Sequence, residues 1–65
     1  MLLKDALSLA RHRKEGRVVY RDGDGSSVID ITDLKKEGTF FRVDDALVPL
    51  HRIRRVDSRG EILWE

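Results

Sequence analysis

Turn-forming sequences divide this chain of 65 residues into pieces too short for anything but a small fold rich in β-strands. Asp-Gly steps in DGDG (22–25) and the sequence DSRG (57–60) favour tight turns with positive φ, and single glycines supply further breaks. We therefore predict an α+β fold, in which an N-terminal helix is followed by a small antiparallel sheet of five or six short strands that curls toward a barrel.

The helix is predicted by apolar residues with the i, i+3, i+4, i+7 spacing of one helix face, at Leu3, Ala6, Leu7 and Ala10. Gly16 stands where a left-handed residue would end this helix. The basic run RHRK (11–14) would then occupy the last turn, where it complements the helix dipole.

Strands are predicted where β-branched and aromatic residues gather between the turns. They are RVVYRD (17–22), SSVIDI (26–31), TFFRV (39–43), ALVPL (46–50), RRV (54–56) and EILWE (61–65). The segment TDLKKEG (32–38) breaks this pattern and predicts a single helical turn, capped by Thr32 or Asp33 and ended by Gly38.

Composition indicates one folded domain over residues 1–65, because hydrophobic residues make up 40% of the chain beside 38% charged residues. The absence of cysteine excludes disulfides and thiolate ligands. No apolar run is long enough to cross a bilayer, so we expect a cytoplasmic protein without a membrane partner. The net charge of +1 says little about partners, so local clusters of charge have to be considered instead.

The strongest basic cluster lies in VPLHRIRR (48–55), where Leu50, Ile53 and Val56 follow steps of three residues instead of the two of a strand. A step of three fits one turn of helix or a bulge. The segment IDITDLKK (29–36) repeats the same order of apolar and basic residues. Each segment is therefore interpreted as strand, single turn, strand.

Such a turn would bury its apolar residues and present four basic ones, which are His51, Arg52, Arg54 and Arg55. Guanidinium groups on a rigid turn suit phosphate, because each offers a planar fork to two oxygens and keeps its charge. His51 can add a hydrogen bond or a charge. The alternative is a solvated basic corner whose arginines pair with nearby carboxylates, at Asp33, Asp44, Asp45 or Asp57.

Metal and nucleophile chemistry find little support in the sequence. The chain has two histidines, His12 and His51, without an H-x-x-x-H spacing, and no G-x-S-x-G elbow surrounds its serines. We expect no metal and no cofactor.

The chain has few aromatic residues, and we expect them first of all to pack in the core. Trp64 and one of Phe40 and Phe41 are predicted to be buried, because neighbouring strand residues face opposite sides. The other phenylalanine, or Tyr20 beside Arg21, would then offer a surface on which an RNA base can stack.

From Val18 to Trp64 the chain resembles a family of small, mostly archaeal proteins of unknown function that has been labelled an RNA cyclic-group end-recognition domain. The family also occurs as a domain in larger eukaryotic proteins. The resemblance rests on the VVY strand (18–20), Asp33-Leu34, the FF pair (40–41), the block V-P-L-H-R-I (48–53) and the terminal G-E-I-L-W (60–64). Family members often have a Trp-Asp step after the first helix and a longer loop after the VVY strand, where this chain has RHRKEG and DGDG.

The resemblance implies binding of RNA that ends in a 2′,3′-cyclic phosphate, with His51 and Arg52 as the residues that match the motif. The leading hypothesis is a non-catalytic RNA-binding module, accessory to RNA repair or processing, that uses His51, Arg52, Arg54, Arg55, Tyr20 and Arg21. One alternative is an enzyme that opens the cyclic phosphate with His51 as general acid or base. The other is a structural or protein-interaction domain with no nucleic-acid role, acting through a protein partner or a homo-oligomer.

Overall fold

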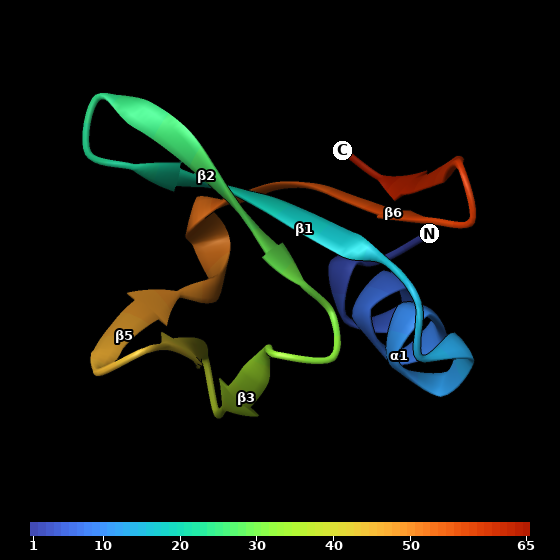
Figure 1. Cartoon of the computed structure of the whole chain (residues 1–65), viewed down its shortest axis with the longest axis horizontal. Coiled ribbons are helices and arrows are strands. Elements are labelled where there is room, and N and C mark those ends of the chain that lie inside the picture. Colours follow the sequence, from blue (N-terminus) through green and yellow to red (C-terminus); the bar gives the residue numbers. More distant parts are fainter.

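The computed structural model describes all 65 residues. It contains one α-helix, seven strands and one 3₁₀ turn (Figure 1). In chain order these are α1 (Leu3–Arg13), β1 (Arg17–Asp22), β2 (Gly25–Asp30), β3 (Lys35–Glu37), β4 (Phe40–Val43), β5 (Ala46–Pro49), η1 (Leu50–Arg52), β6 (Ile53–Ser58) and β7 (Glu61–Trp64).

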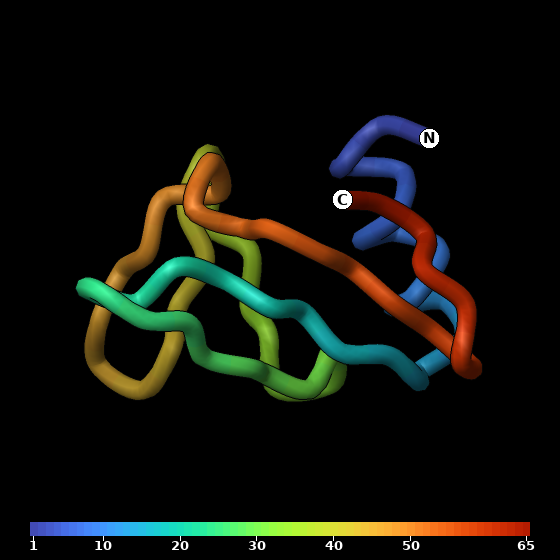
Figure 2. Tube along the Cα trace, turned by 90° about the horizontal axis from the view of Figure 1, so that it is seen from above, coloured from blue at the N-terminus to red at the C-terminus, as the bar shows by residue number.

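The strands form two antiparallel sheets, one ordered β2-β1-β6-β7 and the other β3-β4-β5. The predicted α+β class and the antiparallel pairing are confirmed. The prediction of a single sheet that curls toward a barrel is wrong, because the strands divide between two sheets. The chain leaves the first sheet after β2 and returns to it at β6, and a turn at each crossing interrupts the ladder of hydrogen bonds. Seen from above, the second sheet lies at the opposite end of the molecule from α1 (Figure 2).

The helix forms on the predicted residues and buries Ala6, Leu7 and Ala10 against the first sheet. It ends earlier than expected, because Lys14, two residues before Gly16, takes the left-handed conformation, with φ of 56°. Gly16 serves close packing instead, since a Cβ there would lie 2.5 Å from the carbonyl oxygen of Asp57. No helix has the length and apolar character needed to cross a bilayer.

The predicted hairpin turns are confirmed at Gly23-Asp24, Asp44-Asp45 and Arg59-Gly60. The segment after β2 differs from the prediction. It makes one turn at residues 31–33, but Lys35–Glu37 continue as a strand that pairs with β4. The cap of this turn is Asp30 and not Thr32 or Asp33, because its Oδ1 accepts from the Thr32 N–H at 2.9 Å and from the Thr32 hydroxyl at 2.7 Å.

The hydrophobic core lies between the two sheets and the helix. Its buried members are Ala6, Leu7, Ala10, Val18, Tyr20, Ile31, Leu34, Phe41, Ile53, Val56 and Leu63. Phe41 is fully buried while Phe40 is 40% exposed, as the alternation of strand side chains predicts. Trp64 packs on the core but is only partly buried, short of the prediction.

The two segments with matching sequence patterns are the two connections between the sheets. Residues 31–34 lead from β2 to β3, and η1 leads from β5 back to β6. In each connection a three-residue step turns apolar side chains toward the core, namely Ile31 and Leu34 in the first and Leu50 and Ile53 in the second. The order of strand, single turn and strand, predicted from the matching patterns, is confirmed at both places, whereas the helical turn predicted over residues 32–38 is limited to residues 31–33.

Candidate nucleic-acid interface

Four of the predicted phosphate-binding residues meet in one place, which we call the basic pocket. It is lined by Arg21, Gly23, His51, Arg52 and Arg54, and no carboxylate lines it. Its volume is about 210 Å³, several times the ~30 Å³ that a water molecule occupies in the liquid. The end of β1 and the turn η1, distant in sequence, form its two sides.

The turn η1 holds His51 and Arg52 on the exposed side of the chain. At its start the Leu50 N–H donates to the carbonyl oxygen of Thr39 at 2.9 Å, which ties η1 to the residue before β4. At its end Ile53 is 1% exposed and anchors the turn in the core. With both ends held, His51 and Arg52 are both exposed.

A β-bulge directs Arg54 toward the same pocket. Val19 is opposite Arg55 in the β1–β6 ladder and Tyr20 is opposite Ile53, so Arg54 is an extra residue without a partner on β1. A bulge changes the direction in which side chains leave the strand. The Arg54 Nη1 donates to the carbonyl oxygen of His51 at 3.0 Å, which holds the guanidinium beside η1 and leaves its other donors free.

Three arginines of the basic pocket have no acidic partner. Arg21, Arg52 and Arg54 take part in none of the ion pairs of the molecule. The Nε of Arg21 donates to the carbonyl oxygen of Gly23 at 3.4 Å, a long contact that leaves the outer nitrogens free. A solvated corner of paired arginines therefore does not describe these three residues.

Arg55 behaves differently, although it follows Arg54 directly. Its Nε lies 3.5 Å from Oδ2 of Asp57, and that carboxylate also lies 3.7 Å from Arg17. The Arg55 Nε is buried without a well-formed hydrogen bond, so the contact with Asp57 is electrostatic. Arg55 does not line the basic pocket, and it pairs with a carboxylate as the alternative hypothesis expected.

The ring of His51 is not used to build the turn. His51 is exposed, and only its carbonyl oxygen takes part in a hydrogen bond of the side-chain network. A structural role for the imidazole would have required a buried ring bonded to the backbone. The ring is free to meet a ligand.

Tyr20 lies in the core and not at the site. It is 7% exposed, and its ring packs edge-on against Phe41 with centroids 5.3 Å apart. Phe40 is the aromatic residue that remains accessible near η1, because it pairs with Pro49, the residue before that turn. Of the two residues considered for base stacking, only Phe40 therefore has a ring exposed at the surface.

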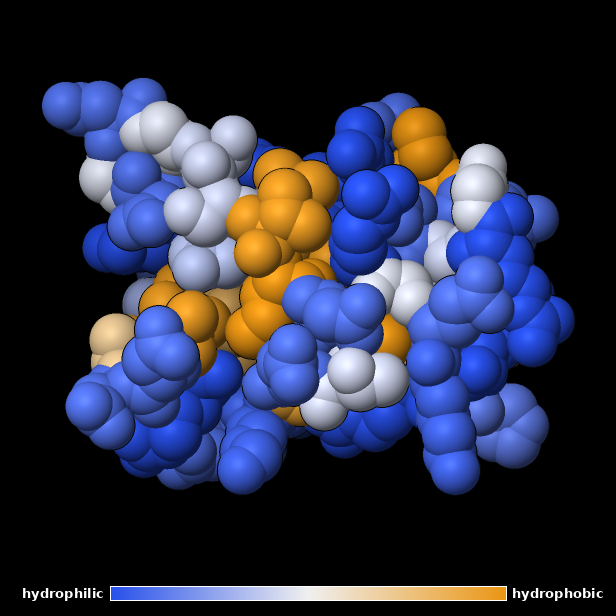
Figure 3. Space-filling model, in the orientation of Figure 1, coloured by the Kyte–Doolittle hydropathy of each residue, from blue (hydrophilic) through white to orange (hydrophobic).

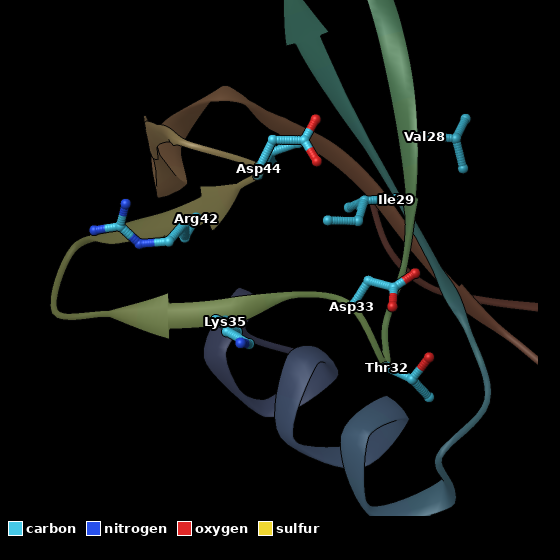
Figure 4. A pocket seen from close by; sticks show the side chains of 8 residues that line it. Val28, Ile29, Thr32, Asp33, Lys35, Arg42 and Asp44 are labelled. Carbon is cyan, nitrogen blue, oxygen red and sulfur yellow. The ribbon is translucent and has the colours of Figure 1, made fainter.

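A second hollow, which the sequence did not suggest, lies between β2 and the β3-β4-β5 sheet (Figure 4). We call it the acidic cleft. It has a volume of about 450 Å³ and is lined by Val28, Ile29, Thr32, Asp33, Lys35, Arg42, Val43 and Asp44. In the space-filling view, hydrophobic atoms gather over this middle part of the molecule between hydrophilic ones (Figure 3). The residues that line the acidic cleft come from separate elements, so no sequence motif predicts the cleft.

Some charged groups around the acidic cleft are bonded to neighbouring side chains, and others have no ion pair. Arg42 is bonded to Glu37, with Nε donating to Oε2 at 2.6 Å, and this bond lowers the pKa of Glu37 and raises the pKa of Arg42. The bonds from Thr32 lower the pKa of Asp30 in the same way. Asp33, Asp44 and Lys35 form no ion pair.

Groups of three or more His, Cys, Asp or Glu side chains that could hold a metal ion are absent from the structure. Comparison with known proteins adds no relative to this picture. No protein-family model matches the chain, no curated protein matches it, and no solved structure matches it.

Proposed function

We propose that the protein is a non-catalytic RNA-binding module whose basic pocket holds the terminal phosphate of an RNA, in particular a 2′,3′-cyclic phosphate. The observation that carries this proposal is the convergence of Arg21, Arg52, Arg54 and His51 on one pocket that no carboxylate lines. Four basic residues from two distant parts of the chain thus line the same volume.

Electrostatics favour an anion at this place. Three guanidinium groups that share a pocket without a counter-charge repel one another, and a bound phosphate replaces that repulsion with attraction. Each guanidinium presents a planar fork that matches two phosphate oxygens. The ring of His51 can donate a further hydrogen bond. A terminal phosphate, cyclic with two free oxygens or linear with three, can accept from these donors.

RNA is proposed because of the sequence resemblance and the neighbouring aromatic residue. The block V-P-L-H-R-I, which carries the resemblance to the RNA end-recognition family, forms η1 and its flanks. Phe40 lies beside η1 and is 40% exposed, and stacking of a base on an aromatic ring contributes about 1–3 kcal/mol.

A binding role is proposed in preference to catalysis because the pocket has a single titratable group suited to proton transfer. His51 is its only histidine, and no carboxylate lines it. Opening of a cyclic phosphate by general acid–base catalysis would profit from a second group that donates or accepts the other proton.

The proposal is tested with one RNA sequence prepared with three different 3′ ends, a 2′,3′-cyclic phosphate, a linear phosphate and a hydroxyl. Charge-assisted hydrogen bonds of about 1.5–3 kcal/mol each predict that the cyclic end binds at least roughly tenfold more tightly than the hydroxyl end. Fluorescence anisotropy at fixed salt concentration measures this. Equal affinities for the three ends would overturn end recognition.

A pair of variants separates the pocket from general charge. Arg52→Ala together with Arg54→Ala is expected to remove the preference for the phosphate end. Arg11→Ala is the control for the loss of a positive charge elsewhere, because Arg11 is an exposed helix residue without an ion pair and lies outside the pocket. The control should weaken binding to all three ends by the same small factor, as loss of one positive charge predicts.

A further inference from the structure

The four edge strands of the two sheets are not equally protected against pairing with another chain. Three of them are short: β3 consists of charged residues only, β5 ends in Pro49, and β7 has four residues. The fourth, β2, has six residues, is uncharged from Gly25 to Ile29, and exposes 59% of Val28. Charges, proline and shortness are the usual means of blocking an edge, so β2 is the open edge of this protein.

Backbone groups at the middle of β2 point away from its partner β1. Asp22 and Gly25 flank a two-residue turn and so form a hydrogen-bonded pair, after which such pairs alternate along an antiparallel ladder. The N–H and C=O groups of Ser26 and Val28 therefore face outward. No backbone hydrogen bond from outside the ladders reaches these two residues.

The acidic cleft runs beside this edge and offers room for side chains. Ile29 points into the cleft, between Asp33 and Asp44, whereas Val28 points the opposite way (Figure 4). Val43 adds a second apolar residue to the lining. A chain that paired with β2 would direct every second side chain toward the same side as Ile29.

Charge in the cleft selects the kind of chain that would fit. Arg42 is paired with Glu37, so the other charged residues of the lining are Asp33, Asp44 and Lys35. Among these three, one negative charge is in excess. A second copy of β2 would bring Asp30 and no basic residue to these carboxylates. A peptide with a lysine or arginine would compensate the charge, while its apolar side chain contacts Ile29.

We propose that β2 and the acidic cleft bind an extended segment of a partner protein by strand addition. The segment would carry an apolar residue and a basic residue two positions apart, both facing the cleft. Main-chain hydrogen bonds to Ser26 and Val28 supply affinity, and contacts in the cleft supply sequence preference. This site is lined by none of the residues of the basic pocket, so it does not depend on RNA binding.

The probe is a capped seven-residue peptide in which threonine alternates with valine, lysine and valine, compared with the same peptide carrying glutamate in place of lysine. In titrations of the ¹⁵N-labelled protein followed by NMR, the largest amide shifts are expected at Ser26 and Val28. The lysine peptide should bind about tenfold more tightly, since like charges placed together at an interface are strongly unfavourable.

Two variants complete the test. Val28→Pro removes an outward N–H that β1 does not use and should abolish peptide binding. Asp33→Asn with Asp44→Asn changes two exposed residues and should make the two peptides bind alike, which keeps the test decisive if the proline variant fails to fold. Peptide shifts that avoid β2, equal binding of both peptides to the unmodified protein, or a β2-dependent dimer in sedimentation would each overturn the proposal.

Discussion

The chain crosses between its two sheets twice, and the two crossings share their apolar residues but differ in charge. Ile31 and Leu34 turn into the core at the first, as Leu50 and Ile53 do at the second. At the positions between them, the first crossing has Thr32-Asp33 and the second has His51-Arg52. The comparison teaches that the three-residue step builds the corner, while the residues between the steps are exposed and free to take a role in binding.

The two crossings, at residues 31–34 and at η1, are the corners of the fold, and they also differ in how their turns are closed. The first is capped by the carboxylate of Asp30, which accepts two hydrogen bonds from Thr32. The turn η1 at the second has no side-chain cap. The Ile53 N–H closes this turn by donating to the carbonyl oxygen of Leu50. The backbone bond from Leu50 to Thr39 and the bond from Arg54 to the His51 carbonyl hold the turn in place. A carboxylate thus caps the turn of the first corner, whereas the turn of the second is closed without an acidic side chain.

The largest expected effects come from removing the anchor of either corner. Leu34→Ala and Ile53→Ala are each expected to lower the free energy of unfolding by about 2–5 kcal/mol, because both residues are almost fully buried. Urea denaturation followed by circular dichroism measures the change. His51→Ala, at an exposed position of the second corner, is the control and should change stability by no more than about 0.5 kcal/mol. Similar losses for His51→Ala and Ile53→Ala would refute the assignment of Ile53 as the anchor.

A smaller effect should separate the corners by function. Lys35 and Arg54 occupy equivalent positions in the two matching segments. Arg54→Ala is expected to weaken binding of the phosphate-ended RNA about tenfold, the loss of one charge-assisted hydrogen bond. Lys35→Ala removes the same charge outside the basic pocket and should weaken it by less than about threefold. Anisotropy titrations of both variants test this, and equal losses would show that net charge, not the pocket, governs binding.

The smallest effect is expected in the pH dependence of stability. Hydrogen bonds from Thr32 hold the pKa of Asp30 below its usual range. A carboxylate with a lowered pKa stabilises the fold above its ordinary pKa, and that contribution is lost as the pH falls through the lowered value. Asp30→Asn keeps an oxygen acceptor but does not titrate, so its melting temperature should fall less between pH 5 and about pH 2.

Glu37 serves as the control for the pH experiment, because its pKa is lowered by Arg42 in the second sheet and not at a corner. Glu37→Gln should also reduce the acid sensitivity, independently of Asp30, and the two effects should add. An acid profile of Asp30→Asn identical to that of the unmodified protein would contradict the role of Asp30 as the cap.

Local features of the fold were readable from the chain because their causes are local. The Asp-Gly and Asp-Asp turns, the apolar face of α1 and the opposite facing of Phe40 and Phe41 each depend on neighbours within a few residues. The same holds for the corner at η1, which its three-residue step predicted. For segment 35–37, a strand in place of the predicted helical turn, the pairing with β4 outweighed the local pattern.

Which residues line the basic pocket and the acidic cleft could not be predicted, because the lining residues are far apart in the sequence. Arg52, Arg54 and His51 were readable as one cluster, but the bulge that separates Arg54 from Arg55 arises only from the register of β6 against β1. The edge-on packing against Phe41 that removes Tyr20 from the surface joins the two sheets. The acidic cleft, with Asp33 and Asp44 on either side of Ile29, has no counterpart in any sequence pattern.

By itself, the sequence determined that this chain makes one helix and short antiparallel hairpins, with a basic turn at residues 50–55. Turn chemistry and side-chain periodicity act over a few bonds and need no distant partner. Only the tertiary structure decided that the strands divide into two sheets, that Arg21 joins the basic pocket while Arg55 leaves it, and that β2 keeps an open edge. Those outcomes depend on the packing of Ile31, Phe41 and Ile53 into one core, a contact between residues that only folding brings together.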